Sequence, residues 1–225
     1  MRTPNVKRRH ARRPTSAFSL VELLVVLGIV ALLVALLLPA LNAARRQSLS
    51  LKCKANLSTN YKFMIMYAND NKGWWAPPDL GALLAMHHRW PVYVFPQKVG
   101  DPPTMLCPAD VEPLQNHSYV LNNHVLDKKV RLGTKTGRSS SDIVLMGEKK
   151  SDAHDYYMQY HHEPGKRFSD FDGVVELYRH GLTLGSNYLM MDGSVATKMP
   201  SEATAGLDPW DLTPDQTTTA PDVQP

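Results

Sequence analysis

The sequence lacks the short motifs by which many enzymes and metal proteins are recognised. It has two cysteines among 225 residues, Cys53 and Cys107, so no Cys-x-x-Cys metal spacing exists. It contains no Gly-x-Ser-x-Gly elbow, no P-loop and no dinucleotide fingerprint. These absences remove the enzyme classes that depend on those motifs.

Acidic residues are also missing from one region, the first 17 residues, which hold six of the 25 Lys and Arg residues. The remaining chain carries 19 basic and 21 acidic side chains, a net charge of −2. The sequence pI near 9.0 therefore reflects the leading segment, and no nucleic-acid partner is expected. Six leading positive charges outnumber the four just beyond the apolar run described next, which indicates a cytoplasmic N-terminus.

A long apolar run follows, from Phe18 to Leu38, and its only charge is Glu22. As a helix, this run of 21 residues would be about 31 Å long, enough to cross a hydrocarbon core of roughly 30 Å. A cleaved secretory signal would have a shorter apolar region and a small-residue cleavage site after it. A plain anchor fits the length but leaves Glu22 without a partner, although a charge in a span usually has one.

A third interpretation comes from the residues around the start of the run, Ala17-Phe18-Ser19-Leu20-Val21-Glu22-Leu23. They resemble the cleavage site of type IV prepilins and pseudopilins, with Ala17 where that family usually has Gly. The resemblance implies that a prepilin peptidase cuts between Ala17 and Phe18 and methylates the new amine. It also implies that Glu22, the fifth mature residue, faces the amine of a neighbouring subunit, and that Pro39 kinks the helix. The implied partners are the peptidase, other pilin or pseudopilin subunits and the assembly machinery of a secretion or pilus system.

The helical pattern continues past the membrane span, and no Gly/Ser linker interrupts it. The sequence predicts a cleaved leader over 1–17, one helix over 18–68 with its transmembrane part at 18–38, a globular α+β ectodomain over 69–200 and a disordered acidic tail over 201–225. A helix is also expected at 79–90, and strands at 118–121, 142–146 and 174–178. A hairpin at 187–197 should turn at Asp192-Gly193. The apolar face of the long helix is expected to comprise Leu41, Ala44, Leu51, Leu57, Tyr61, Met64, Ile65 and Ala68.

A second resemblance is scattered over the globular part. It resembles the bacterial prepilin-like proteins that carry a C-terminal H-X9-DG motif, although eleven residues separate His180 from Asp192 here. The residues that carry it are Cys53-x-x-Asn56-Leu57, Tyr67-Ala-Asn-Asp70 with Gly73, Cys107-Pro108-Ala-Asp110, Ser118-Tyr119 with Asn122, Glu148, and Arg179-His180 with Asn187 and Asp192-Gly193. It implies the same processing signal, long helix and small sheet.

Three side chains of the globular part are candidates for a metal or acid–base site: Glu148, His180 and Asp192. Turn chemistry already explains Asp192, so a structural role is favoured over a site. No cofactor is expected, although calcium stays open because major pseudopilins bind it near their C-terminal sheet. Cys53 and Cys107 lie beyond the span in the predicted topology, which favours a disulfide over two separate buried thiols.

These features predict an α+β protein with a long N-terminal transmembrane helix packed on a small antiparallel sheet. The chain should be a non-enzymatic, prepilin-like subunit of a type II secretion pseudopilus or a type IV pilus-like filament. It would cross the bacterial inner membrane once, with its C-terminal domain periplasmic or extracellular. The rival hypothesis is a membrane-tethered periplasmic binding protein or enzyme that uses Glu148, His180 and Asp192.

Overall fold

The computed structural model describes residues 19–75, 90–95, 102–127, 130–158, 171–203, 210 and 212. The predicted leader, including Ala17, and Phe18 lie outside these residues. The chain divides into two compact units, Met1–Ala43 and Ala44–Pro225. The second unit, which holds the sheet, is called the head below.

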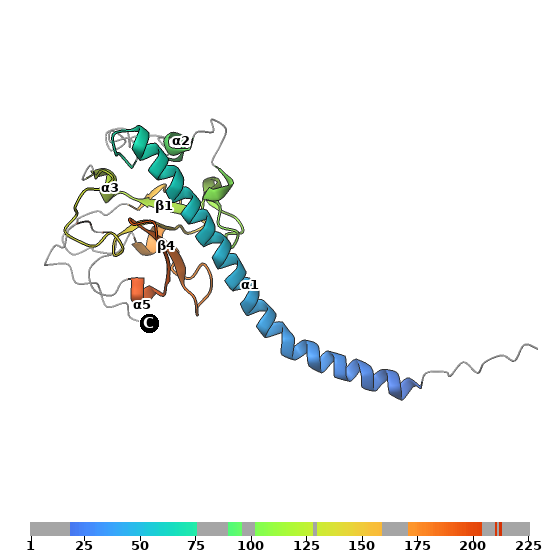
Figure 1. The fold of residues 1–225 in the computed structure, drawn as a ribbon. Coiled ribbons are helices and arrows are strands. Elements are labelled where there is room, and N and C mark those ends of the chain that lie inside the picture. The colour runs from blue at the N-terminus through green and yellow to red at the C-terminus, as the bar shows by residue number, and fades with distance from the viewer. Residues whose placement is uncertain are drawn as a thin grey trace, which may run out of the picture. The chain divides into compact units, whose positions relative to one another are not determined.

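One helix, α1, runs from Leu20 to Asp70 over 51 residues (Figure 1). It begins and ends within two residues of the predicted bounds, and it is continuous through Pro39. It stops in the stretch Asn69-Asp70-Asn71-Lys72-Gly73, where the amide of Gly73, at φ 85°, donates to the carbonyl oxygen of Ala68 over 2.7 Å. That left-handed glycine after the last turn is a common way to end a helix.

Within the head, α1 buries one stripe of side chains at three- and four-residue spacings. The stripe is not wholly apolar, because Ser50 and Asn60 belong to it and each bonds to another element. Leu51, which the apolar pattern assigned to this face, is 65% exposed. The buried residues of the stripe are Ser50, Cys53, Leu57, Asn60, Met64 and Ala68.

The head contains a five-stranded sheet in the order β3-β1-β2-β4-β5. Three of its four strand pairs are antiparallel, as predicted, and the fold is α+β. The strands are β1 Tyr119–Asn122, β2 Val144–Glu148, β3 Tyr157–Met158, β4 Ser186–Met190 and β5 Val195–Lys198.

One pair differs from the prediction of an antiparallel sheet, because β3 runs parallel to β1. The connection from β2 to β3, residues 149–156, stays at one end of the sheet, so β3 starts at the same end as its neighbour β1. Lys149 holds this loop, since its ammonium donates to the carbonyl oxygens of Leu114 and Ala153. The sheet is therefore mixed.

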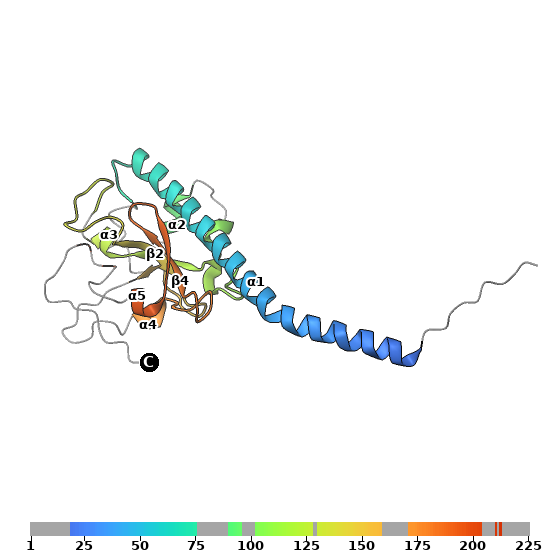
Figure 2. The same cartoon turned by 60° about the horizontal axis from the view of Figure 1, so that its bottom comes forward.

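Both faces of the sheet are buried, which explains why β1, β2 and β4 are buried at every position. On one face, Tyr119 and Leu121 join a core with the buried stripe of α1, and Figures 1 and 2 show α1 crossing this face. On the other face, Val120 packs with Tyr188 and Trp210.

One predicted strand and one predicted helix have different outcomes. The expected strand at 174–178 is wrong: helix α4, Phe171–Val174, occupies its start, and only Val175 forms a bridge, to Lys149. β4 already pairs with that edge of β2, so this segment bonds only at the end of the strand, where Glu176 donates to the carbonyl oxygen of Glu148 and Lys150 donates to that of Val174. The helix expected at 79–90 lies outside the described residues except for Trp90, which begins α2, Trp90–Val94.

Part of the predicted disordered tail belongs to the core. Trp210 and Leu212 are 0% and 1% exposed. Gly147 leaves the space that Trp210 fills, because a Cβ built there would lie 2.8 Å from the indole ring. The remaining short elements are η2 Pro103–Met105, η3 Leu114–Asn116, α3 His124–Asp127 and α5 Pro200–Ala203.

Candidate functional site

The start of α1 forms a capped helix end that includes Glu22. The backbone amide of Ser19 donates to the Glu22 carboxylate over 2.9 Å, and the amide of Leu23 donates to the carbonyl oxygen of Ser19 over 3.2 Å. A carboxylate three residues into a helix that returns to the first backbone amide is half of a capping box. The Ser-x-x-Glu spacing was visible in the sequence, but the sequence analysis did not use it. In the single chain, Glu22 therefore stabilises its own helix end.

The first half of α1 presents its apolar side chains outward. Every large hydrophobic residue from Leu20 to Leu41 is 46–75% exposed. This helix is long and apolar enough to cross a membrane, and it is the single such candidate among the described residues. A helix whose surface is apolar all round is suited to lipid or to other apolar helices. Pro39 has no amide proton to donate to the carbonyl oxygen of Ala35, so one backbone bond is missing there.

A buried disulfide joins α1 to the loop that precedes β1. Cys53 and Cys107 are bonded, with their Cα atoms 5.1 Å apart, as the predicted topology indicated. Two hydrogen bonds brace the same junction: Asn56 Nδ2 donates to the carbonyl oxygen of Leu106 over 2.7 Å, and Asn60 Nδ2 donates to that of Thr104 over 3.0 Å. The outer half of α1 is therefore fixed in register against this loop.

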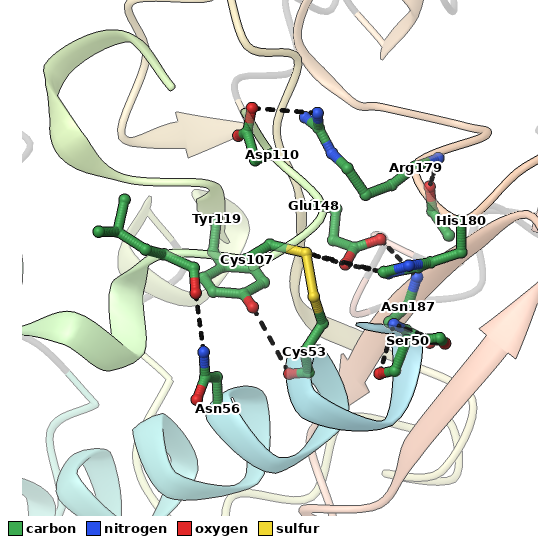
Figure 3. Close-up of a disulfide and its surroundings, with 12 residues drawn as sticks. Ser50, Cys53, Asn56, Cys107, Asp110, Tyr119, Glu148, Arg179, His180 and Asn187 are labelled. Atoms are coloured by element: carbon green, nitrogen blue, oxygen red, sulfur yellow. Dashed lines mark hydrogen bonds and ion pairs between the residues drawn. A yellow bond between two sulfur atoms is a disulfide. The ribbon is translucent and has the colours of Figure 1, made fainter. Parts of the chain in front are cut away.

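Glu148 and His180 lie together beside the disulfide, both with fully buried side chains (Figure 3). Glu148 is the last residue of β2, and His180 precedes β4 in a turn. His180 Nε2 lies 2.8 Å from Glu148 Oε1, and Cys107 Sγ lies 3.5 Å from the same oxygen. The other carboxylate oxygen accepts the backbone amide of Asn187 over 2.8 Å. The sequence identifies Glu148 and His180 as candidate site residues, but it does not show that their side chains are in contact.

Asp192, the third candidate, is not part of this group. It is exposed in the loop between β4 and β5, where its carboxylate accepts the backbone amide of Ser194 over 2.9 Å and the Ser194 hydroxyl over 2.6 Å. Gly193 follows at φ 87°, and the predicted hairpin forms, with a four-residue loop over 191–194. The structure therefore assigns Asp192 to turn formation and does not bring the three candidates into one site.

The geometry of the pair does not match a Cys-His-Glu catalytic triad. In such a triad the nucleophile and the carboxylate contact opposite ring nitrogens. Here Glu148 Oε1 and Cys107 Sγ both approach Nε2, at 2.8 and 4.0 Å, while Nδ1 has no hydrogen-bond partner. The sulfur is also bonded to Cys53, so it is not a free nucleophile.

A second buried polar cluster, which the sequence analysis missed, braces the loop after β2. Arg179 forms an ion pair with Asp110 at 3.2 Å and also donates to the backbone oxygen of Lys149. Burial lowers the pKa of the Lys149 ammonium to about 8, and the Asp110 carboxylate opposes this shift. The cluster links three loops around one end of the sheet.

A capped helix with an outward-facing apolar first half, followed by a small α+β head, fits the class of membrane-anchored proteins with one N-terminal span. The family model for a prokaryotic N-terminal methylation motif matches residues 12–38. The chain is also 40% identical over 62 residues to the type IV wide pilus major component PilA4 of Thermus thermophilus. That alignment covers 28% of this chain and 47% of PilA4, about half the length of the relative. No solved structure matches. Together, the motif, the relative and the fold support a type IV pilin-like protein.

Proposed function

We propose that this chain is a subunit of a type IV pilus-like filament, held in the inner membrane before assembly by the first half of α1. The methylation motif at 12–38, which includes an apolar span whose single charge is Glu22, carries the proposal. The match to a component of a type IV pilus favours this filament over a type II secretion pseudopilus, which is the second candidate.

In this role, a prepilin peptidase cuts between Ala17 and Phe18 and methylates the new amine. The basic leader stays in the cytoplasm, and the head lies on the periplasmic or extracellular side. Assembled subunits pack through the span, where Glu22 pairs with the amine of a neighbouring Phe18. The role requires no chemistry from the head, in keeping with the fully buried side chains of Glu148 and His180.

Mass spectrometry of the mature N-terminus tests this proposal. We expect the chain to begin at N-methylated Phe18 when it is expressed with a prepilin peptidase, and at Met1 in a host that lacks one. Ala17→Gly, which restores the residue usual in the family, should be cut at the same bond at least as fast. A chain that keeps its leader beside the active peptidase, or that is cut after residue 38, would contradict the proposal.

The tethered-enzyme hypothesis needs an open site built from Glu148, His180 and Asp192. The structure buries the first two and places Asp192 in a separate turn, so the three residues do not form the open site that this hypothesis needs.

A further inference from the structure

The disulfide and the buried pair form a convergent set of four potential metal ligands. The Sγ atoms of Cys53 and Cys107, one Glu148 oxygen and one His180 nitrogen all lie within 4.8 Å of one another. The four residues come from α1, the loop before β1, the end of β2 and the turn before β4, and all are buried (Figure 3). As described, the disulfide occupies both sulfurs, so they cannot serve as thiolate ligands.

The orientation of His180 allows it to act as a metal ligand. Its Nε2 atom points at both the carboxylate and the disulfide, so all four atoms face one point, as ligands around an ion do. Nδ1, on the other side of the ring, has no partner and can carry the ring proton when Nε2 binds a metal.

We propose that reduction of the Cys53–Cys107 disulfide converts this cluster into a buried zinc site with the ligands Cys53, Cys107, His180 and Glu148. Two thiolates, one imidazole and one carboxylate are ligands that Zn²⁺ accepts in tetrahedral geometry. Tetrahedral bonds of about 2.0–2.3 Å separate the ligand atoms by about 3.3–3.8 Å. The nitrogen–oxygen distance, now 2.8 Å, must therefore open by about half an ångström, and the sulfurs must move apart from bonding contact.

The reaction balances with a dithiol as the reductant. The dithiol gives two hydrogen atoms and two electrons, the Cys53–Cys107 bond breaks to two thiols, and the dithiol becomes a disulfide. Zn²⁺ then displaces the two thiol protons into solvent, and the ring proton of His180 moves to Nδ1. Because two thiolates accompany a doubly charged ion, loading adds no net charge to the buried cluster.

Neighbouring residues already hold Glu148 in place for this role. Its second oxygen accepts the amide of Asn187 over 2.8 Å. The side chain of Asn187 accepts the Thr197 hydroxyl over 2.8 Å and donates to Ser50 Oγ over 3.2 Å. Such partners around a ligand orient it and typically change metal affinity 10–100-fold. The zinc form would link α1 to the sheet through the same residues as the disulfide.

The test uses the full chain in detergent, reduced anaerobically with a phosphine and titrated with Co²⁺ and then Zn²⁺. We expect one equivalent of Co²⁺, with the visible d–d bands of tetrahedral thiolate coordination, and displacement of those bands by Zn²⁺. The oxidised chain should show neither. His180→Gln and Glu148→Gln should each weaken binding by about 10-fold or more, whereas Asp192→Asn and His154→Gln, outside the cluster, should not.

A variant that fails to fold would also lose the metal, so the ligands are identified directly by X-ray absorption on the zinc-loaded wild type. Two sulfur and two nitrogen or oxygen ligands, with near-ultraviolet circular dichroism restored by zinc, would support the site. Any other ligand set, the same affinity in His180→Gln, or a reduced chain that stays unfolded with zinc would overturn it.

Discussion

At the scale of single residues, Gly193 in the loop between β4 and β5 is a tightly restricted position. Its φ of 87° disfavours any residue with a side chain, and a Cβ there would lie 2.4 Å from Tyr61 Cε1. Tyr61 cannot easily move away, because it packs on Trp75 and its hydroxyl donates to the backbone oxygen of Met191. Gly193 therefore lets the hairpin approach α1 closely.

We expect Gly193→Ala to lower the free energy of unfolding by about 2–4 kcal/mol, from backbone strain plus overpacking. Gly133→Ala is the matched control, because Gly133 has φ 81° but open space around a Cβ, so it should cost only about 1–2 kcal/mol. Urea unfolding of both variants measures the difference. Equal losses in the two variants would mean that the contact with Tyr61 contributes nothing.

Tyr188 provides a second prediction at this scale, one that depends on pH. Burial raises the pKa of its phenol, and the nearby Glu148 carboxylate adds to the shift. The folded chain therefore keeps this proton above pH 10, while the unfolded chain releases it, so stability is lost as the pH rises past about 10. The hydroxyl has no hydrogen-bond partner, so Phe can replace Tyr188 at little cost.

We expect Tyr188→Phe to match the wild type at pH 7 and to exceed it by about 1.4 kcal/mol at pH 11. Unfolding free energies measured at pH 7, 9, 10 and 11 give the comparison. Buried Tyr119 and Tyr157, whose pKa values burial also raises, remain in both proteins, so only the difference between the curves belongs to Tyr188. If the unfolding free energies of the two proteins changed in parallel from pH 9 to 11, the raised pKa of Tyr188 would be contradicted.

At the scale of elements, the disulfide is a covalent cross-link between α1 and the loop that precedes β1. The two cysteines are 54 residues apart, and closing a loop of that length restricts the unfolded chain by about 4 kcal/mol. We expect Cys53→Ala with Cys107→Ala to lose about that much stability in the absence of added metal. Ser50→Ala, which removes a noncovalent contact between α1 and β4, should cost only about 1 kcal/mol. A double variant as stable as the wild type in urea would argue against this role.

Much of the arrangement of elements could be predicted, because it is encoded locally. The long apolar run and the helical pattern that continues it predicted α1, and Asp192-Gly193 marked the hairpin. The parallel pairing of β3 and the docking of Trp210 depend on contacts between distant segments, which periodicity does not report. For the same reason, the sequence identified Glu148 and His180 as candidates but did not predict their contact. It also grouped Asp192 with them, although Asp192 only forms local hydrogen bonds in its turn.

At the scale of the whole molecule, Glu22 has two possible partners at different stages. In the single chain its carboxylate accepts the amide of Ser19. In the proposed filament it would pair with the amine of Phe18 from a neighbouring subunit, within a bundle of low dielectric where an unpaired charge is costly. Capping therefore needs only an acceptor oxygen, whereas pairing needs the charge.

This difference gives a sharp test of assembly. Glu22→Gln keeps an acceptor for the helix cap but loses the charge, and Glu22→Val loses both. We expect both variants to insert in the membrane and fold their heads but to be excluded from filaments, and Glu22→Asp to assemble partially because the charge remains on a shorter side chain. Crosslinking of subunits beside a membrane-fraction control measures this. Normal incorporation of Glu22→Gln would show that the charge has no role in packing.

The continuity of α1 also has a mechanical consequence. Tension along the outer half of the helix would enter the loop before β1 through the covalent bond at Cys53, one helical turn from the hydrogen bond that Asn56 donates to the same loop. Covalent bonds do not yield at forces that separate packed side chains, so the helix could not be peeled from the sheet beyond that point. Under oxidising conditions such a subunit would stretch or break elsewhere first, and the redox state of one bond would set how the head responds to pulling.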